Sequence, residues 1–444
     1  MAPEERQQDS ERTGHRPSFN EAFRFWLKLG FISFGGPAGQ IAIMQTELVD
    51  RKKWISQARF LHALNFCMLL PGPEATQLAI YIGWLFHKTW GGIVAGALFV
   101  MPSMFLLWAL SFVYAAYGNV PWIAAIFHGL KPAVMAIVAV AVLRIGHKAL
   151  KSPFMWCIAA VAFAGLFFFK IPFPAIILGA AFVGFLGERA WLTRFVGVVT
   201  GDGSKNHRIL SDEEESPGQT RPSWSRAARI SVVCITLWWT PIFLVGLWQG
   251  WDHTLFKEGL FFSKAAVVTF GGAYAVLPYV AQQAVEKFGW LQTGQMMDGL
   301  GLAETTPGPL IMVLQFVGFM GGWNKPGLLP PLLAGTAGAL ITTWATFVPC
   351  FLWILLGAPH LEQLRGNPKL TAALSAVTAA VVGVILNLAV WFGLHALFPT
   401  GRALDWFAFA LSVVAFVGML KWKWHVIPVV AGSGIAGLLY QLAA

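Results

Sequence analysis

A succession of long apolar segments is the feature of this sequence that most limits its fold. Each is close to the ~20 residues that a membrane-spanning helix needs. Six lie before residue 190, one lies alone in the middle, and six follow: 22–46, 60–86, 90–117, 121–145, 153–169, 171–188, then 229–249, then 259–283, 295–320, 327–356, 370–397, 403–420 and 424–443. Only 12% of residues are charged, against about 25% in soluble domains. The sequence therefore predicts an all-α polytopic membrane protein.

The chain also contains an internal duplication. At a constant offset of 236 residues, Phe34-Gly35-Gly36 aligns with Phe270-Gly271-Gly272, and Pro71-Gly72-Pro73 aligns with Pro307-Gly308-Pro309. From residue 25 to 78 there are 12 identities over 54 ungapped positions, where unrelated segments of ordinary composition would give about three. We therefore expect five parts: a cytoplasmic tail 1–20, an N-terminal transport repeat 21–190, a cytoplasmic linker 191–228, a transmembrane helix 229–250 and a C-terminal transport repeat 251–444.

The basic residues predict that the two repeats face opposite ways. The stretch RKKWISQAR at 51–59 carries four positive charges, whereas its equivalent KFGWLQTGQ at 287–295 carries one. Loss of Lys and Arg from a matching loop indicates that this loop lies on the other face of the membrane. The single segment 229–249 supplies the reversal. The N-terminus is then cytoplasmic and the C-terminus lies outside.

The number of crossings stays open at this stage. If every apolar segment spans the membrane, there are 13 crossings and the basic cluster at 51–59 lies outside, against the positive-inside rule. If 22–46, 60–86 and their equivalents each dip in and return, nine crossings remain and the conflict disappears. Broken or re-entrant helices are therefore part of the predicted fold.

The first repeated motif places a pair of glycines in the middle of an apolar segment, in LGFISFGGPAGQ and AVVTFGGAYAV. Glycine pairs permit a broken helix, which is tolerated in a membrane only where it is buried in protein or lines a cavity. The amides that begin the new helix suit an oxyanion, and a hydroxyl precedes each break. Alternatively, the glycines only let helices pack closely. The substrate-binding residues predicted from this motif are Ser33, Gly35, Gly36, Thr269, Gly271 and Gly272.

The second repeated motif, Pro-Gly-Pro, must also interrupt a helix, because each proline lacks an N–H and clashes with the preceding turn. Gly72 and Gly308 are its central residues and complete the predicted backbone site. Glu74 follows the first copy and Glu304 precedes the second by three residues. Intramembrane carboxylates are costly and mark relays or ion paths, so both are candidates for proton coupling. Glu74 has an alternative role as a helix N-terminal charge, and Asp298, near a segment end, is interpreted as interfacial.

Lys28 and Lys264 are the only ionised side chains that are identical in the two copies. A charge inside a membrane costs at least about 2.5 kcal/mol unless it is paired or solvated. We expect the two lysines to attract a divalent anion, with snorkelling to the interface as the alternative. Lys131 and Arg144 are weaker candidates for the same role, and Arg144 together with Lys148 is typical of a cytoplasmic helix end.

Other classes of function receive no support. The four cysteines form no CxxC pair and the ten histidines no HxxxH pattern, so neither a metal nor a cofactor is predicted, and no nucleophile constellation indicates an enzyme. The net charge of +10 is spread among apolar segments, as topology requires, and does not predict nucleic-acid binding. Membrane lipid is the expected surrounding, and a homodimer is left open.

The motifs resemble those of the chromate ion transporter family, in its long two-domain form. The resemblance covers about residues 19–442 and rests on SFGGP at 33–37, PGPEATQLAIYIGW from Pro71, TFGGAYAVLPYV at 269–280 and ETTPGPLIMVLQFVGF at 304–319. It implies export of chromate across the plasma (inner) membrane and chromate resistance. Membrane potential can drive this export, with protons as a further coupling ion. The alternative function is a carrier or channel for sulfate or a related oxyanion.

Overall fold

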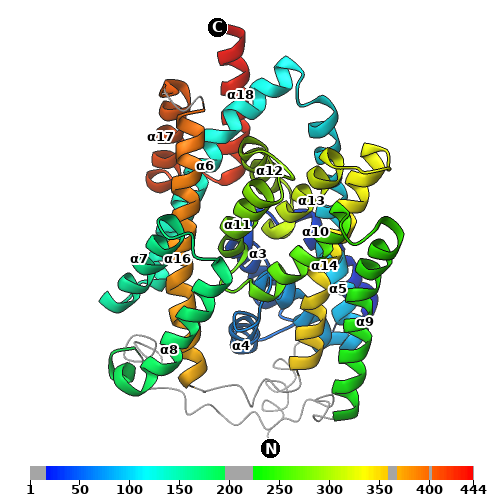
Figure 1. The fold of residues 1–444 in the computed structure, drawn as a ribbon. Coiled ribbons are helices and arrows are strands. Elements are labelled where there is room, and N and C mark those ends of the chain that lie inside the picture. Colours follow the sequence, from blue (N-terminus) through cyan, green and yellow to red (C-terminus); the bar gives the residue numbers. More distant parts are fainter. Residues whose placement is uncertain (1–16, 196–223, 359–367, 400–402, 444) are drawn as a thin grey trace, which may run out of the picture.

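The computed structural model describes residues 17–195, 224–358, 368–399 and 403–443, and their regular structure is helical throughout (Figure 1). Most of the predicted tail 1–20 and linker 191–228 lies outside these residues. Six of the described helices have the length and hydropathy of a membrane span: Glu74–Tyr117, Pro121–Ala149, Trp224–Gln249, Pro331–Gly357, Thr371–Leu397 and Val426–Ala443. The predicted all-α polytopic architecture is confirmed.

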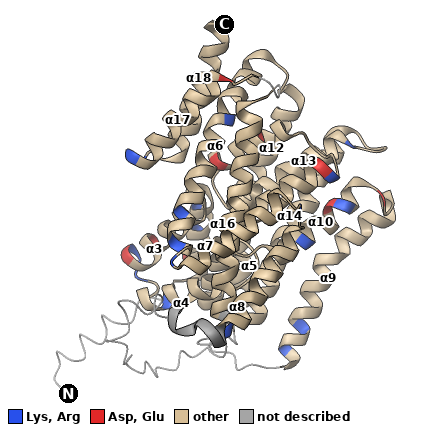
Figure 2. Cartoon of the chain, turned by 60° about the vertical axis from the view of Figure 1, so that its left-hand side comes forward, with Lys and Arg blue, Asp and Glu red and all other residues tan. Residues whose placement is uncertain are grey.

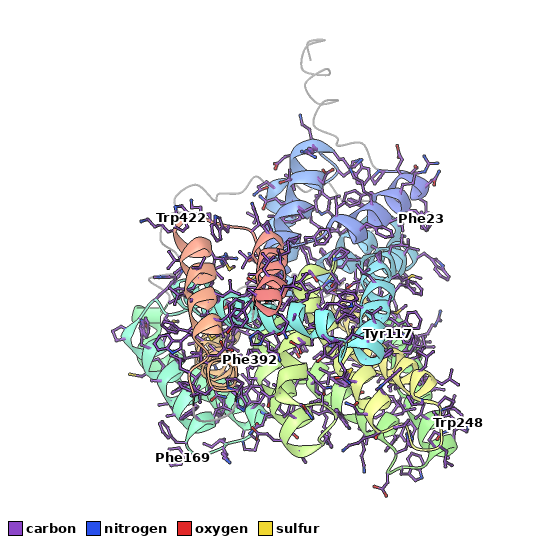
Figure 3. All side chains as sticks on the ribbon, turned by 90° about the horizontal axis from the view of Figure 1, so that it is seen from above. Phe23, Tyr117, Phe169, Trp248, Phe392 and Trp422 are labelled. Atoms are coloured by element: carbon purple, nitrogen blue, oxygen red, sulfur yellow. The ribbon has the colours of Figure 1, made fainter. Side chains whose placement is uncertain are left out.

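Large apolar side chains cover the outside of the molecule. Figure 3 labels several that lie at its rim, including Phe169, Trp248 and Trp422, which are 76%, 65% and 59% exposed. By contrast, Phe392, labelled further in, is fully buried. An exposed apolar perimeter of this extent fits contact with lipid, which is as apolar as the side chains themselves.

The N-terminal half begins with two interrupted segments. Segment 22–46 is divided into α2 (Phe19–Ile32) and α3 (Gly36–Gln45), which continues as the π-helix η1 (Thr46–Arg51). Segment 60–86 is divided into α4 (Gln57–Cys67) and the start of α5 (Glu74–Tyr117). The interruptions fall at the FGG and PGP motifs, as predicted.

Both interrupted segments turn back toward the end at which they began. The ring of Trp54, just after η1, lies 5.4 Å from that of Phe25 in α2 and 5.9 Å from that of Phe86. The backbone of α5 leaves helical geometry at His87 and Lys88, so residues 74–86 and 89–117 form two antiparallel arms. The N-terminal half therefore contains two re-entrant helical hairpins followed by a long helix.

The C-terminal half repeats this plan after α9 (Trp224–Gln249). Its elements are α10 (Thr254–Val268), α11 (Ala273–Ala281), η3 (Gln282–Lys287), α12 (Thr293–Thr305), η4 (Leu310–Met312), α13 (Val313–Asn324) and the long α14 (Pro331–Gly357). Trp290, the equivalent of Trp54, lies 5.6 Å from the ring of Phe261, and its carbonyl accepts a hydrogen bond of 2.8 Å from Nδ2 of Asn324. The same side-chain closure thus holds the second pair of hairpins.

The remaining helices pack against helices of the other half. They are α6 (Pro121–Ala149), α7 (Pro153–Phe167), α8 (Phe173–Phe195), α16 (Pro368–Leu397), α17 (Trp406–Lys421) and α18 (Val426–Ala443). α16 packs against α7 and α8, while α6 packs against α17 and α18. Figure 1 shows α7, α8, α16 and α17 to one side and α9, α10 and α14 to the other. The starts of α3 and α11 lie between these two groups.

Candidate functional site

Two reciprocal hydrogen bonds join the four repeated motifs. The amide of Gly72 donates to the carbonyl of Thr269 at 2.7 Å, and the amide of Gly308 donates to the carbonyl of Ser33, also at 2.7 Å. Both donors and both acceptors are related by the offset of 236 residues. The PGP turn of each half therefore docks on the FGG turn of the other half, and the four breaks form one site.

The hydroxyls beside the FGG breaks donate hydrogen bonds to carbonyls of the helices that precede them. Ser33 Oγ donates to the carbonyl of Leu29 and Thr269 Oγ1 donates to the carbonyl of Ala265, each at 2.6 Å. Both residues are fully buried. In this arrangement their backbone carbonyls anchor the PGP turns, and their hydroxyl protons point back into α2 and α10.

Backbone conformation explains why glycine occupies the paired positions of both FGG motifs. Gly35 and Gly36 have φ of 89° and 67°, and Gly271 and Gly272 have φ of 80° and 90°, a region that strains other residues. A Cβ added to Gly36 would meet nothing within 4 Å, and one added to Gly271 would meet Val381 at an ordinary 3.6 Å. Close packing of helices does not account for these glycines.

Free amides remain at both FGG breaks. α3 begins at Gly36 and α11 at Ala273. Among the described residues no hydrogen bond engages the amide N–H of Gly35, Gly36, Gly271 or Gly272. Gly35 is exposed. Unpaired amides at a helix start, together with the helix dipole, favour a negatively charged ligand.

Glu74 lies at the start of α11. Its Oε1 is 3.6 Å from the position of a Cβ built on Gly272, and Glu74 is itself the first residue of α5. The positive ends of two helices, α5 and α11, therefore converge on this carboxyl. At the start of α5, Glu74 has the alternative role given above, that of a negative charge at a helix N-terminus. At the other break the residue equivalent to Glu74 is Leu310. The start of α3 thus lacks a carboxyl at the matching position.

A second carboxyl and two cations complete the polar centre. Glu304, 3% exposed, accepts a hydrogen bond of 2.5 Å from the hydroxyl of Tyr274 in α11. Arg144 and Lys148 are exposed residues in the last turns of α6. The charge of Arg144 acts on Glu304 and Tyr274, and the charge of Lys148 acts on Glu74. Charged residues are sparse in the helical body (Figure 2).

The two lysines predicted for the site lie on α2 and α10, the helices that precede the FGG breaks, but not at the breaks themselves. Lys28 and Lys264 are exposed side chains five residues before Ser33 and Thr269, and neither forms an ion pair with a described residue. The structure therefore does not bring them against the free amides. Their charges lie on the outer faces of α2 and α10.

Asp298, interpreted from the sequence as interfacial, is buried in the protein. The residue is 4% exposed, its carboxylate accepts a hydrogen bond of 2.8 Å from the hydroxyl of Tyr114, and it lies 4.0 Å from Nζ of Lys131. α12 packs between α6 and α13, and this packing covers Asp298. Lys131 consequently has a carboxylate partner of its own.

Unpaired polar side-chain atoms cluster around the PGP turns. Nε2 of Gln40 donates to the carbonyl of Gly308, and Nε2 of Gln77 donates to the carbonyl of Pro71 at 2.7 Å. The Oε1 atoms of both glutamines and the hydroxyl of Ser103 are buried without a partner in the described residues. Buried polar atoms are normally paired with protein or water, so these atoms mark places for water or a polar solute.

The docking of the PGP turn predicts a stability difference between two glycine variants. Gly308 has φ of 98°, and an added Cβ would lie 2.6 Å from Cβ of Ser103. Gly308→Ala should therefore lower the free energy of unfolding by about 2–4 kcal/mol, from backbone strain and overlap together. Gly36→Ala, which has strain but no overlap, should lose about 1 kcal/mol. Thermal unfolding of the purified variants measures both, and equal losses would contradict the docking.

Comparisons with known proteins agree with the duplication. The family model described as chromate transporter matches residues 20–185 and again 256–438. The chromate transport protein of Pseudomonas aeruginosa is 32% identical over 438 residues, 95% of this chain and 92% of that protein. The chromate transport protein of Cupriavidus metallidurans is 28% identical over 419 residues, 94% and 91% of the two chains.

A shorter relative matches part of the chain. The uncharacterized transporter YwrB of Bacillus subtilis is 29% identical over 147 residues, which is 71% of that protein but 33% of this chain. No solved structure matches the chain. The two matches of the family model together cover most of the sequence, and they leave α9 and the residues before it between them. This chain belongs to the chromate transporter family.

Proposed function

We propose that this protein exports chromate by alternating access and binds the dianion at the joined FGG and PGP breaks. The observation that carries the proposal is the reciprocal pair of hydrogen bonds, Gly72 to Thr269 and Gly308 to Ser33. They bring two helix starts with free amides into one centre, in a chain whose relatives include chromate transport proteins. Chromate is a compact oxyanion, which such amides can surround in place of water.

The contacts of α9 support an inverted arrangement of the halves. Arg226 at its start lies 5.9 Å from the ring of Trp84 in the N-terminal half, while Gly246 near its end packs against Trp251 and Phe256 at the start of α10. The 26 residues of α9 correspond to about 39 Å of helix. Hairpins that begin at opposite ends of such a helix suit inverted repeats that rock around a central site, with the N-terminus cytoplasmic and the C-terminus outside.

Charge complements the amides. Arg144 and Lys148, exposed residues near the end of α6, have charges that act on Glu304 and Glu74 respectively. A dianion that enters this centre meets two carboxyls as well as two cations. We propose that Glu74 and Glu304 bind protons when the anion arrives, which removes the repulsion and leaves both cations to the anion.

The membrane potential supports the direction of transport. A dianion that leaves a cell with a negative interior gains about 2.3 kcal/mol per charge per 100 mV, hence roughly 4–5 kcal/mol. This energy is sufficient for export without another gradient. Proton movement then modifies the cycle and is not its only source of energy.

Lys28 and Lys264 are proposed to attract the anion toward the breaks from the exposed faces of α2 and α10. The double substitution to glutamine should slow anion arrival and raise the KM for chromate about threefold to tenfold at low salt, with little change in kcat. Transport rates at two ionic strengths check this. A tenfold fall in kcat would assign the lysines to the binding centre instead.

Everted membrane vesicles test the function itself. With the potential and the pH gradient imposed separately, vesicles that contain the protein should accumulate labelled chromate when the lumen is positive, and control vesicles should not. Excess sulfate distinguishes the rival function of a general sulfate carrier or channel, since sulfate should then block chromate entry or itself accumulate. No accumulation under any gradient would reject chromate export.

A further inference from the structure

Glu258 is a fully buried carboxyl far along the chain from the PGP acids. It lies in α10, is 0% exposed, and neither of its oxygens has a hydrogen-bond partner among the described residues. A Cβ added to Gly321 of α13 would touch Oε1, and one added to Gly338 of α14 would lie 2.9 Å from Oε2. Two glycines thus form a socket that fits this carboxyl and nothing larger.

The socket is particular to the C-terminal half. At the offset of 236 residues, Glu258 corresponds to Ala22. Gly321 lies against Trp290, and its counterpart is Phe86, whose ring lies 5.9 Å from that of Trp54, the equivalent of Trp290. The N-terminal half has the small residue on its first helix and the large residue opposite. In the C-terminal half the large residue is on the first helix and the small residue is opposite. Cores tolerate exchanges that conserve volume, so the packing of the socket is compensated while its chemistry is changed.

No charge compensates this carboxyl. On α10 itself, Lys257 pairs with Asp252 at 3.2 Å and Lys264 is exposed. The described charged or titratable groups of the other elements around the socket are few. They are Cys350 in α14, Arg226, Arg229 and Cys234 in α9, Tyr274 and Tyr279 in α11, Glu286 and Lys287 in η3, and His253 and Lys325 in the flanking turns, with none in α13. None of them forms a hydrogen bond or ion pair with Glu258. An ionised carboxylate would be uncompensated here, so the acid is stable in this packing only when it carries a proton.

We propose that Glu258 is a proton-binding site, separate from the breaks, which is occupied while α10 packs against α13 and α14 and is emptied when α10 moves away from them. α10 ends at Val268, and the carbonyl of the next residue, Thr269, holds the PGP turn of the other half. A movement of α10 therefore acts on the anion centre. If the proposed chromate export is correct, the proton is carried on the anion-free return step, opposite in direction to the anion.

Infrared spectroscopy of the purified, membrane-reconstituted protein tests the site without any transport. The wild type at neutral pH should show a protonated-carboxyl C=O band that is missing from Glu258→Gln and retained in Asp252→Asn, an exposed acid six residues earlier. If the spectra of wild type and Glu258→Gln are the same in this region, Glu258 carries no proton and the proposal is overturned, whatever the protein transports.

Vesicle transport tests the coupling. If one proton is exchanged at Glu258 per anion, a gradient of one pH unit should make the steady-state chromate ratio of the wild type differ about tenfold from that of Glu258→Gln, whatever protons the breaks bind, while accumulation driven by potential persists in both. The double variant Glu258→Ala, Gly321→Leu fills the socket with apolar side chains and should behave like Glu258→Gln. A full pH response in either folded variant would overturn the coupling, whereas failure of the wild type to accumulate chromate would reject the proposed function alone.

Discussion

Arg144→Gln should reduce chromate transport about 30-fold to 100-fold. A charge-assisted interaction with an anion contributes about 2–3 kcal/mol, and this substitution removes the cation whose charge acts on Glu304 and Tyr274. Arg144→Lys, which keeps the charge, should retain most of the activity. Initial rates of labelled chromate uptake into everted vesicles measure the effect at equal protein content.

The choice of control decides what a loss of transport means. Lys131 is also a basic residue of α6, but it lies 4.0 Å from Asp298 and is paired there. Lys131→Gln should therefore change stability more than anion affinity. If Arg144→Gln transported at the wild-type rate, or if Lys131→Gln lost as much chromate affinity as Arg144→Gln, the end of α6 would not form part of the anion centre.

Glu304→Gln should bind chromate more tightly than the wild type and should lose much of the pH dependence of binding. The amide resembles the protonated acid, so repulsion of the dianion disappears at every pH. Removal of one negative charge from the centre should raise affinity at least about tenfold, which corresponds to 1.4 kcal/mol. Equilibrium binding of chromate to the purified protein, from acid to alkaline pH, checks both effects.

Asp298→Asn is the matched control for this experiment. Asp298 is also buried in α12 and also accepts a hydrogen bond from a tyrosine hydroxyl, but its partners Tyr114 and Lys131 do not belong to the breaks. It should leave the affinity for chromate and its pH dependence unchanged. Weaker binding by Glu304→Gln would mean that this carboxyl supports the anion through Tyr274 and does not repel it.

The breaks could be predicted from the sequence because local chemistry dictates them. Pro-Gly-Pro cannot remain helical, and the glycine pairs at Gly35 and Gly271 occupy φ values that other residues avoid. The repeat then indicated that the motifs belong together. The family followed from the same strings and is confirmed by the match over both halves.

Local chemistry could not decide whether each interrupted segment forms a re-entrant hairpin or spans the membrane. An apolar hairpin and an apolar span have similar length and hydropathy, and only contacts such as Trp54 with Phe25 reveal that the chain returns. The burial of Asp298 could not be predicted for the same reason, because it depends on the packing of α12 between α6 and α13.

Glu258 escaped notice for a related reason. It stands one residue after a half-buried lysine, near the start of α10, where a glutamate is ordinarily solvated. Its burial depends on Gly321 and Gly338, which lie more than 60 residues further along the chain. Only the packing of three helices places these residues together.

The position of the bound anion is the most direct test. Chromium scatters X-rays anomalously, so a crystal of the protein grown with chromate reports the location of the anion directly. We expect an anomalous difference peak beside the helix starts at Gly35-Gly36 and Gly271-Gly272, within reach of the end of α6. A peak elsewhere in the molecule, with the breaks empty, would contradict the account.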